Sequence, residues 1–292
     1  MTSPKPAPPG FTKSEWEEFE ENGLIHLDDR IDPESVDRYL DIGRQLVAGM
    51  VPSSKNTNKI EDLVLRHRDL QELIDHERHI GFAYDIFGDT VRLSQNDMIV
   101  RQPGAVVNHW HIDGPRAVPF RVFSPVLPLK LRIGYWLTDV PHDEMGNLVY
   151  LPGSHRAGYD GEHTSTGTLP GERVLRARAG SITVFHASLW HRVQPNNSTS
   201  TRVNFFLSYT PSWISGYRFY DPQWAASLTR ERRIIVRPYG EDQERFIRPP
   251  AADLPLFDDP DSARTVDGVE KHKVRRLTRY EREFASSHRR QP

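Results

Sequence analysis

The first part of the chain carries patterns typical of helices. Thr12 and the acidic residues after it predict the start of a helix, and Gly23 predicts its end. Asp32 followed by Pro33 predicts a second helix, in which apolar residues recur at near-helical spacing. A third, interrupted helical stretch is expected over 61–87.

Beyond residue 88 the pattern changes to short β-rich runs separated by Gly and Pro. Such runs after a helical region predict a mainly β fold with flanking helices, as in a sandwich or a jelly roll. Prolines are dense over 113–131, so we expect an irregular excursion there. The expected strands cover 97–102, 131–137, 146–151, 181–185 and 202–209.

The length of 292 residues suits one large domain with terminal segments. We expect a flexible, proline-rich lead over residues 1–10, a single domain over 11–255 and a charged tail over 256–292. Within that domain, a helical buttress would occupy about 11–88 and the β core about 94–210.

Composition narrows the function classes. The formal net charge of −2 gives no reason to expect a nucleic acid or a membrane surface as partner. No apolar run could serve as a signal-peptide core or span a bilayer, so we expect a cytoplasmic protein. With no cysteine, disulfides and thiolate metal sites are excluded, and any metal must bind to His, Asp or Glu.

The segment 108–113 carries candidate metal ligands. If its backbone is extended, His111 and Asp113 point to the same side and can reach one ion. The best third candidate is His191. Two imidazoles and one carboxylate leave three coordination positions open, the arrangement of iron(II) oxygenases. A lone His-x-Asp triplet is common by chance, so the neighbouring residues determine how strongly it indicates a metal site.

Arg202 stands at the start of a predicted apolar strand. An arginine is costly to bury without a partner, and its planar fork suits the distal carboxylate of a dicarboxylic acid. A 2-oxoglutarate pocket would have this feature.

Several motifs occur together over roughly residues 94–210. They are Trp110-His111-Ile112-Asp113, Gly146-Asn147-Leu148, Leu151-Pro152-Gly153-Ser154-His155, Gly180-Ser181, Phe185-His186, Leu189-Trp190-His191 and Asn196-Asn197-Ser198 with Arg202. In these motifs and in their order, the chain resembles the phytanoyl-CoA dioxygenase family of 2-oxoglutarate oxygenases. The helical region before them matches this family only in general character.

The resemblance implies a double-stranded β-helix in which His111, Asp113 and His191 hold iron(II) and Arg202 anchors 2-oxoglutarate. With dioxygen, such an enzyme hydroxylates an aliphatic C–H bond of a small molecule and releases succinate and CO₂. Asp113 favours hydroxylation over halogenation, whereas desaturation, epoxidation and cyclisation stay open. Leu148 departs from relatives that have a polar residue contacting the cosubstrate.

Other residues carry weaker predictions. His109 shares a face with His111; we expect it to contact the cosubstrate, and the alternative is a cupin-like dioxygenase or isomerase that uses it as a ligand and needs no 2-oxoglutarate. A binding module without turnover is a third alternative. Arg132, Arg116 and Trp136 are candidates for contact with the substrate, which would then carry an anionic group.

Overall fold

The computed structural model describes residues 3–114, 128–157, 165–214, 220–237 and 253–258. The chain forms two compact units, which we call the sheet unit and the second unit. The sheet unit comprises Thr12–Leu73 and Gln95–Ser208. The second unit comprises Met1–Phe11, Ile74–Ser94 and Tyr209–Pro292.

The first helices of the sheet unit begin where their capping residues predict. Helix α1 (Lys13–Asn22) starts with a capping box, in which Oγ1 of Thr12 accepts a hydrogen bond from the Glu15 amide and the Glu15 carboxylate accepts one from the Thr12 amide. Gly23 ends this helix in the left-handed conformation, with φ 77°. Asp32 caps α2 (Pro33–Val47) by accepting a hydrogen bond from the Ser35 amide at 2.8 Å.

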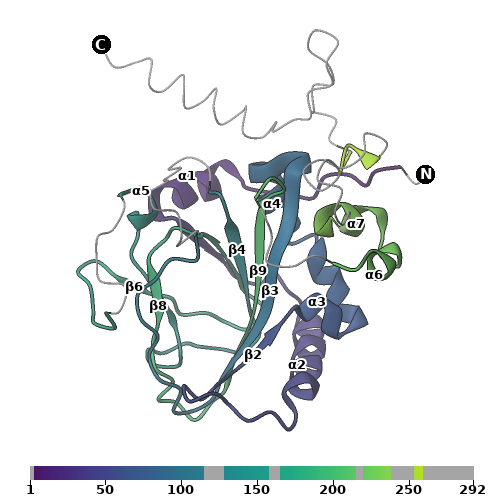
Figure 1. Cartoon of the computed structure of the whole chain (residues 1–292). Helices are drawn as coiled ribbons and strands as arrows, with labels where there is room; N and C mark the ends of the chain where they lie inside the picture. The colour runs from purple at the N-terminus through teal and green to yellow at the C-terminus, as the bar shows by residue number, and fades with distance from the viewer. Residues whose placement is uncertain (1–2, 115–127, 158–164, 215–219, 238–252, 259–292) are drawn as a thin grey trace, which may run out of the picture. The chain divides into compact units, whose positions relative to one another are not determined.

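Antiparallel strands form two sheets (Figure 1). The six-stranded sheet has the order β1-β7-β4-β9-β3-β2, and the three-stranded sheet has the order β6-β5-β8. The first residues of β3 and the last of β9 belong to the second unit. The strands are β1 (Leu24–Leu27), β2 (Thr57–Glu61), β3 (Val91–Arg101), β4 (Leu131–Trp136), β5 (Leu148–Tyr150), β6 (Arg173–Val174), β7 (Ile182–His186), β8 (His191–Val193) and β9 (Arg202–Pro211).

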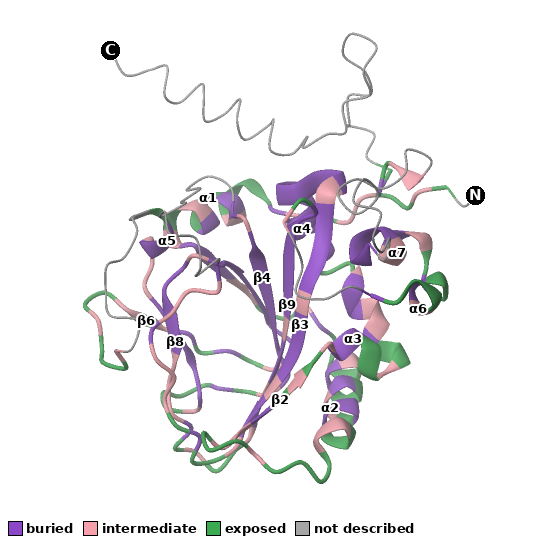
Figure 2. Cartoon of the chain, in the orientation of Figure 1, coloured by how far each residue is buried: buried purple, intermediate pink, exposed green. Residues whose placement is uncertain are grey.

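Successive side chains along each strand point to opposite faces of the large sheet. On one face, Tyr39 of α2 packs against Tyr135 and Phe205, with ring centroids 6.5 and 5.6 Å away. On the other face, the next residues along β4 and β9, Trp136 and Phe206, belong to a core cluster shared with the small sheet. The strands are accordingly buried along most of their length (Figure 2).

The remaining helices are short. In the sheet unit, α3 (Leu63–Arg66) and the 3₁₀ helix η1 (Arg68–Ile74) follow β2, and α5 (Ser154–Ala157) follows β5. The second unit holds α4 (Ile80–Phe87), the 3₁₀ helix η2 (Gly88–Thr90), α6 (Pro222–Ala226) and α7 (Arg230–Val236).

Polar contacts inside the second unit fix both ends of the described chain. The Phe11 amide donates to Asp85 at 2.7 Å. The backbone near Pro6, in the expected flexible lead, pairs with Asp258. Residues 259–292 of the expected tail lie outside the described residues, as do residues 115–127 of the proline-rich excursion. No described helix is both long and apolar enough to cross a bilayer.

The mainly β fold with flanking helices is confirmed, and all five expected strands are present, although β3 begins earlier than expected. The helical stretch expected over 61–87 is present as α3, η1 and α4. Strands β1, β2, β6 and β8 were not expected. They contain five residues or fewer; the equally short β5 and β7 were expected because they overlap the β-rich runs 146–151 and 181–185.

Candidate metal centre

His111, Asp113 and His191 form a cluster in the sheet unit. Each offers one ligand atom, and these atoms lie within 4.8 Å of one another. The two histidines, far apart in sequence, face each other across an antiparallel β-bridge: the His111 amide donates to His191 O at 2.9 Å and the His191 amide to His111 O at 3.0 Å. The Asp113 amide donates to Ala187 O at 2.8 Å, which fixes the third member.

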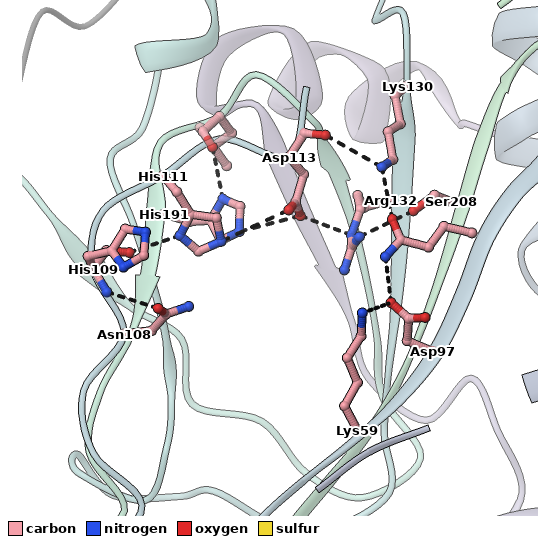
Figure 3. Close-up of polar contacts among 12 residues, drawn as sticks. Lys59, Asp97, Asn108, His109, His111, Asp113, Lys130, Arg132, His191 and Ser208 are labelled. Carbon is pink, nitrogen blue, oxygen red and sulfur yellow. Dashed lines mark hydrogen bonds and ion pairs between the residues drawn. The ribbon is translucent and has the colours of Figure 1, made fainter. Parts of the chain in front are cut away.

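Backbone carbonyls set the orientation of both imidazoles (Figure 3). Nδ1 of His111 lies 2.8 Å from the His109 carbonyl, and Nδ1 of His191 lies 2.9 Å from the Leu189 carbonyl. A carbonyl only accepts, so Nδ1 carries the proton and, in the neutral ring, Nε2 carries the lone pair. The Nε2 atoms face Asp113, 3.9 Å from Oδ1 for His111 and 3.5 Å from Oδ2 for His191. This donor set fits iron(II).

Arg132 of β4 forms an ion pair with Asp113, with Nε 3.0 Å from Oδ2. Its guanidinium carbon lies 5.1 Å from the ring centroid of Phe206 and 6.0 Å from that of Phe185. Nη1 also donates to Ser208 Oγ at 3.3 Å. Burial acts to raise the pKa of Asp113, but the positive charges around it, Arg132 first, hold that pKa well below its usual value. Asp113 therefore stays an anion.

A cavity of about 500 Å³ in the sheet unit opens onto this cluster. Its wall combines charged residues with apolar ones from both sheets. The lining residues are Met50, Val51, Ser53, Lys55, Thr57, Asn58, Lys59, Ile99, Arg101, Asn108, His111, Asp113, Arg132, Leu148, Phe185, His191, Val193, Arg202 and Phe206. The volume suits a small organic molecule.

Arg202 lines the same cavity from the start of β9. It is buried, its Nη1 donates to the Gly146 carbonyl, and its guanidinium carbon lies 5.5 Å from the ring centroid of Trp136. Burial lowers its pKa, and the nearby charge of Arg101 lowers it further. A carbonyl and an aromatic ring bring no full negative charge, so this cation has the character of an anion-binding group.

The remaining candidate residues from the sequence, His109, Trp136 and Arg116, differ in what the structure shows of them. His109 does not belong to the described metal cluster, and its backbone carbonyl orients His111. Trp136 packs against Arg202, and its indole N–H donates to Thr183 at 2.8 Å. Arg116 lies outside the described residues. The assignment of Arg132, Arg116 and Trp136 to the substrate stays a prediction.

Sequence patterns missed part of the cavity wall. Lys59 lies on β2, a strand that was not expected; its Nζ is 2.8 Å from Glu61 and 3.4 Å from the buried Asp97. Arg101 lies in an expected strand, and a buried charge in such a strand is the signal that singled out Arg202. Met50 and Val51 precede β2 without any motif.

A mainly β fold with a His-Asp-His cluster that opens onto a cavity is typical of mononuclear non-haem iron oxygenases. The sequence agrees, because residues 19–204, more than half of the chain, match the model of the family described as phytanoyl-CoA dioxygenase (PhyH). The chain belongs to this family. No curated protein matches it in sequence.

Solved structures share the fold. HygX from Streptomyces hygroscopicus, with nickel and 2-oxoglutarate bound, has a TM-score of 0.63 and 18% identity over 73% of this chain and 92% of its own. The carbocyclase SnoK from nogalamycin biosynthesis has a TM-score of 0.57 and 22% identity, covering 72% and 88%. The epimerase SnoN from the same biosynthesis has a TM-score of 0.55 and 23% identity, covering 68% and 82%.

Proposed function

We propose that the protein is an iron(II)- and 2-oxoglutarate-dependent dioxygenase that hydroxylates an aliphatic C–H bond of a small molecule and releases succinate and CO₂. The observation that carries this proposal is the meeting of the metal cluster and Arg202 on one cavity. HygX, crystallised with 2-oxoglutarate and in another structure with hygromycin B, supports both the cosubstrate and a small-molecule substrate.

In this function, His111, Asp113 and His191 would hold the metal through the atoms that already converge. Iron(II), when bound, would couple the oxidation of 2-oxoglutarate by dioxygen to attack on the substrate. The two backbone carbonyls keep the imidazole Nε2 atoms directed at the site, and Arg132 keeps one oxygen of Asp113 in place. The protein therefore supplies a preformed anionic ligand set.

Arg202 would bind the distal carboxylate of 2-oxoglutarate. The buried guanidinium can donate two N–H groups to a carboxylate, and burial strengthens a charge-assisted pair relative to water. The cosubstrate would thus have a fixed direction, with its oxo-acid end at the metal cluster. We infer that Arg202 selects dicarboxylic oxo-acids over oxo-acids that are too short to reach it.

The apolar part of the wall would hold the prime substrate. Ile99, Val193 and Phe206 line the cavity beside the cluster and can place an aliphatic carbon near the metal while excluding water. The cation Arg132 would attract a substrate anion, although it already carries a partner in Asp113. This leaves the anionic character of the substrate as a prediction.

A cupin-like enzyme without cosubstrate is the alternative, and it requires His109 as a ligand. The described cluster contains Asp113 instead, and the His109 residue contributes its carbonyl. The dioxygenase is therefore the better supported function.

The test combines cosubstrate turnover with isotope labelling. The iron-loaded protein is incubated with 2-oxoglutarate, ¹⁸O₂ and a library of small molecules, and succinate and products are measured by mass spectrometry. Hydroxylation predicts succinate formation together with a product containing one ¹⁸O atom. A product without label would indicate cyclisation or epimerisation, and no succinate with any compound, or without one, would contradict the proposal.

A further inference from the structure

A second buried arginine lies beside Arg202 in the cavity wall. Arg101 ends β3 and Arg202 begins β9; their exposed fractions are 5% and 3%, and both line the cavity. A methyl group placed on Gly146 would lie 3.4 Å from Nε of Arg101 and 3.4 Å from Cδ of Arg202. The two side chains are therefore neighbours that both approach the position where a Cβ of this residue would lie.

Neither guanidinium forms an ion pair with a carboxylate within the part of the chain that the structure describes. Arg101 donates from Nη2 to the carbonyls of Val106 and Gln194, and Arg202 donates from Nη1 to that of Gly146. Nε of each is buried without a hydrogen-bond acceptor. These carbonyls satisfy some N–H groups but bring no negative charge.

Two buried cations side by side are unfavourable without an anion. Burial lowers the pKa of Arg101 to about 10, and burial together with the charge of Arg101 lowers that of Arg202. Of the described residues that line the cavity, only Asp113 is acidic, and it is paired with Arg132. An anionic ligand bound in the cavity would therefore remove a repulsion that the described residues leave in place.

We propose that Arg101 is a second binding residue for the distal carboxylate of 2-oxoglutarate, acting beside Arg202. This inference rests on the proposed function and extends its cosubstrate site by one residue. Two guanidinium groups can share the two carboxylate oxygens, and each N–H···O contact is charge-assisted. The pair would favour a dicarboxylate over a monocarboxylate more strongly than one arginine does.

A purely structural role for Arg101 has a different signature. Its bond to Val106 fixes the segment that leads from β3 to His111, so loss of this bond alone would disturb the metal cluster. Binding of every ligand at the metal would then weaken together. A carboxylate-binding role affects only ligands long enough to reach the two arginines.

Calorimetric titrations of manganese(II)-loaded protein with 2-oxoglutarate and with oxalate separate the two roles. Oxalate can chelate the metal but is too short to extend to the arginines. The variants are Arg101→Gln, Arg101→Lys, Arg202→Gln and the Gln double variant. Arg44→Gln is the matched control, because Arg44 lies exposed on α2 and pairs with Asp41.

We expect Arg101→Gln to raise the Kd for 2-oxoglutarate about 10-fold or more, with the Kd values for oxalate and manganese(II) changed by less than about twofold. Arg101→Lys recovers part of the loss, and the double variant loses less than the product of the two single effects. Arg44→Gln behaves as the wild type.

An unchanged Kd for 2-oxoglutarate in Arg101→Gln overturns the inference, as does an equal loss of oxalate and 2-oxoglutarate affinity. Failure of the wild-type protein to bind 2-oxoglutarate at all is a separate result. It would contradict the proposed function itself.

Discussion

Nε of Arg132 lies 3.0 Å from Oδ2 of Asp113, so the candidate ligand carboxylate already has a partner on the large sheet (Figure 3). The other oxygen, Oδ1, faces Nε2 of His111. Because Phe185 and Phe206 lie beside the guanidinium, Arg132 has little freedom to move away. The contact holds Asp113 in an orientation in which one oxygen can bind a metal.

Arg132→Gln is expected to weaken metal binding about 10–100-fold, the usual effect of removing a group that orients a ligand. The Arg132 charge also repels a nearby cation, but we expect the loss of orientation to outweigh that repulsion. Manganese(II) titration followed by electron paramagnetic resonance measures the affinity, and Arg132→Lys, which keeps the charge, should be less affected. Tighter metal binding in Arg132→Gln would show that repulsion dominates.

Asp113→Ala removes the only carboxylate of the described cluster. We expect iron(II) affinity to fall about 100-fold or more and succinate formation to be lost, because two neutral imidazoles bind the ion less tightly. Asp143→Ala is the control, since Asp143 is half exposed and pairs with Arg176. Normal hydroxylation by Asp113→Ala would place the metal elsewhere.

Gly23→Ala is expected to destabilise the protein by about 2–4 kcal/mol. Gly23 has φ +77°, and an added Cβ would lie 2.4 Å from Nδ1 of the buried His155 and 2.9 Å from Leu189. Gly49→Ala is a matched control, because Gly49 also has φ +77° but no neighbour within 4 Å. Urea unfolding should show that Gly49→Ala lowers the free energy of unfolding by only about 1 kcal/mol. Equal decreases in the two variants would exclude a steric contribution at Gly23.

His155 should make stability depend on pH. Burial, and then the charge of Arg156, lower its pKa from 6.5 to about 4, and a contact with the Glu20 carbonyl opposes this change. Among the described residues, His186 is another titratable neighbour, with ring centroids 5.0 Å apart. At pH values between the pKa of His155 in the folded protein and 6.5, its pKa in the unfolded chain, the unfolded chain binds a proton that the folded protein does not. Stability therefore falls as the pH drops from 6.5 towards 4.

On acidification from pH 7 to pH 5, protonation of His155 in the unfolded chain should lower the free energy of unfolding by roughly 2 kcal/mol. Urea unfolding at both pH values measures it, with His155→Gln as the comparison. The variant should lose less stability on acidification than the wild type. The same loss in both proteins would mean that His155 titrates normally in the folded state.

Local sequence signals predicted the helices before residue 88, strands β3, β4, β5, β7 and β9, and most of the candidate site, but not α5, α6 or α7. Thr12 and Asp32 cap helices through contacts within three residues, so their effect is visible in the sequence. Arg202 stood out because a charge began an apolar strand. The partner of Arg132 could not be predicted in this manner, since its pairing with Asp113 depends on how β4 lies beside the segment that follows His111.

Long-range pairing also explains what the sequence does not show about the cavity. The bridge between His111 and His191 joins segments 80 residues apart, and β8 alone has three residues. Arg101 and Arg202 become neighbours only because β3 and β9 are adjacent in the sheet. Contacts of this kind depend on strand order rather than on local composition.

Anaerobic titration of the iron(II)-loaded protein with 2-oxoglutarate tests the central claim most directly. Chelation of iron(II) by the oxo-acid gives a weak visible charge-transfer band. We predict a band that saturates at one 2-oxoglutarate per protein, is absent in Asp113→Ala and requires more 2-oxoglutarate in Arg202→Gln. Bound iron without any such band would contradict the account and would favour an enzyme that uses His109 and no cosubstrate.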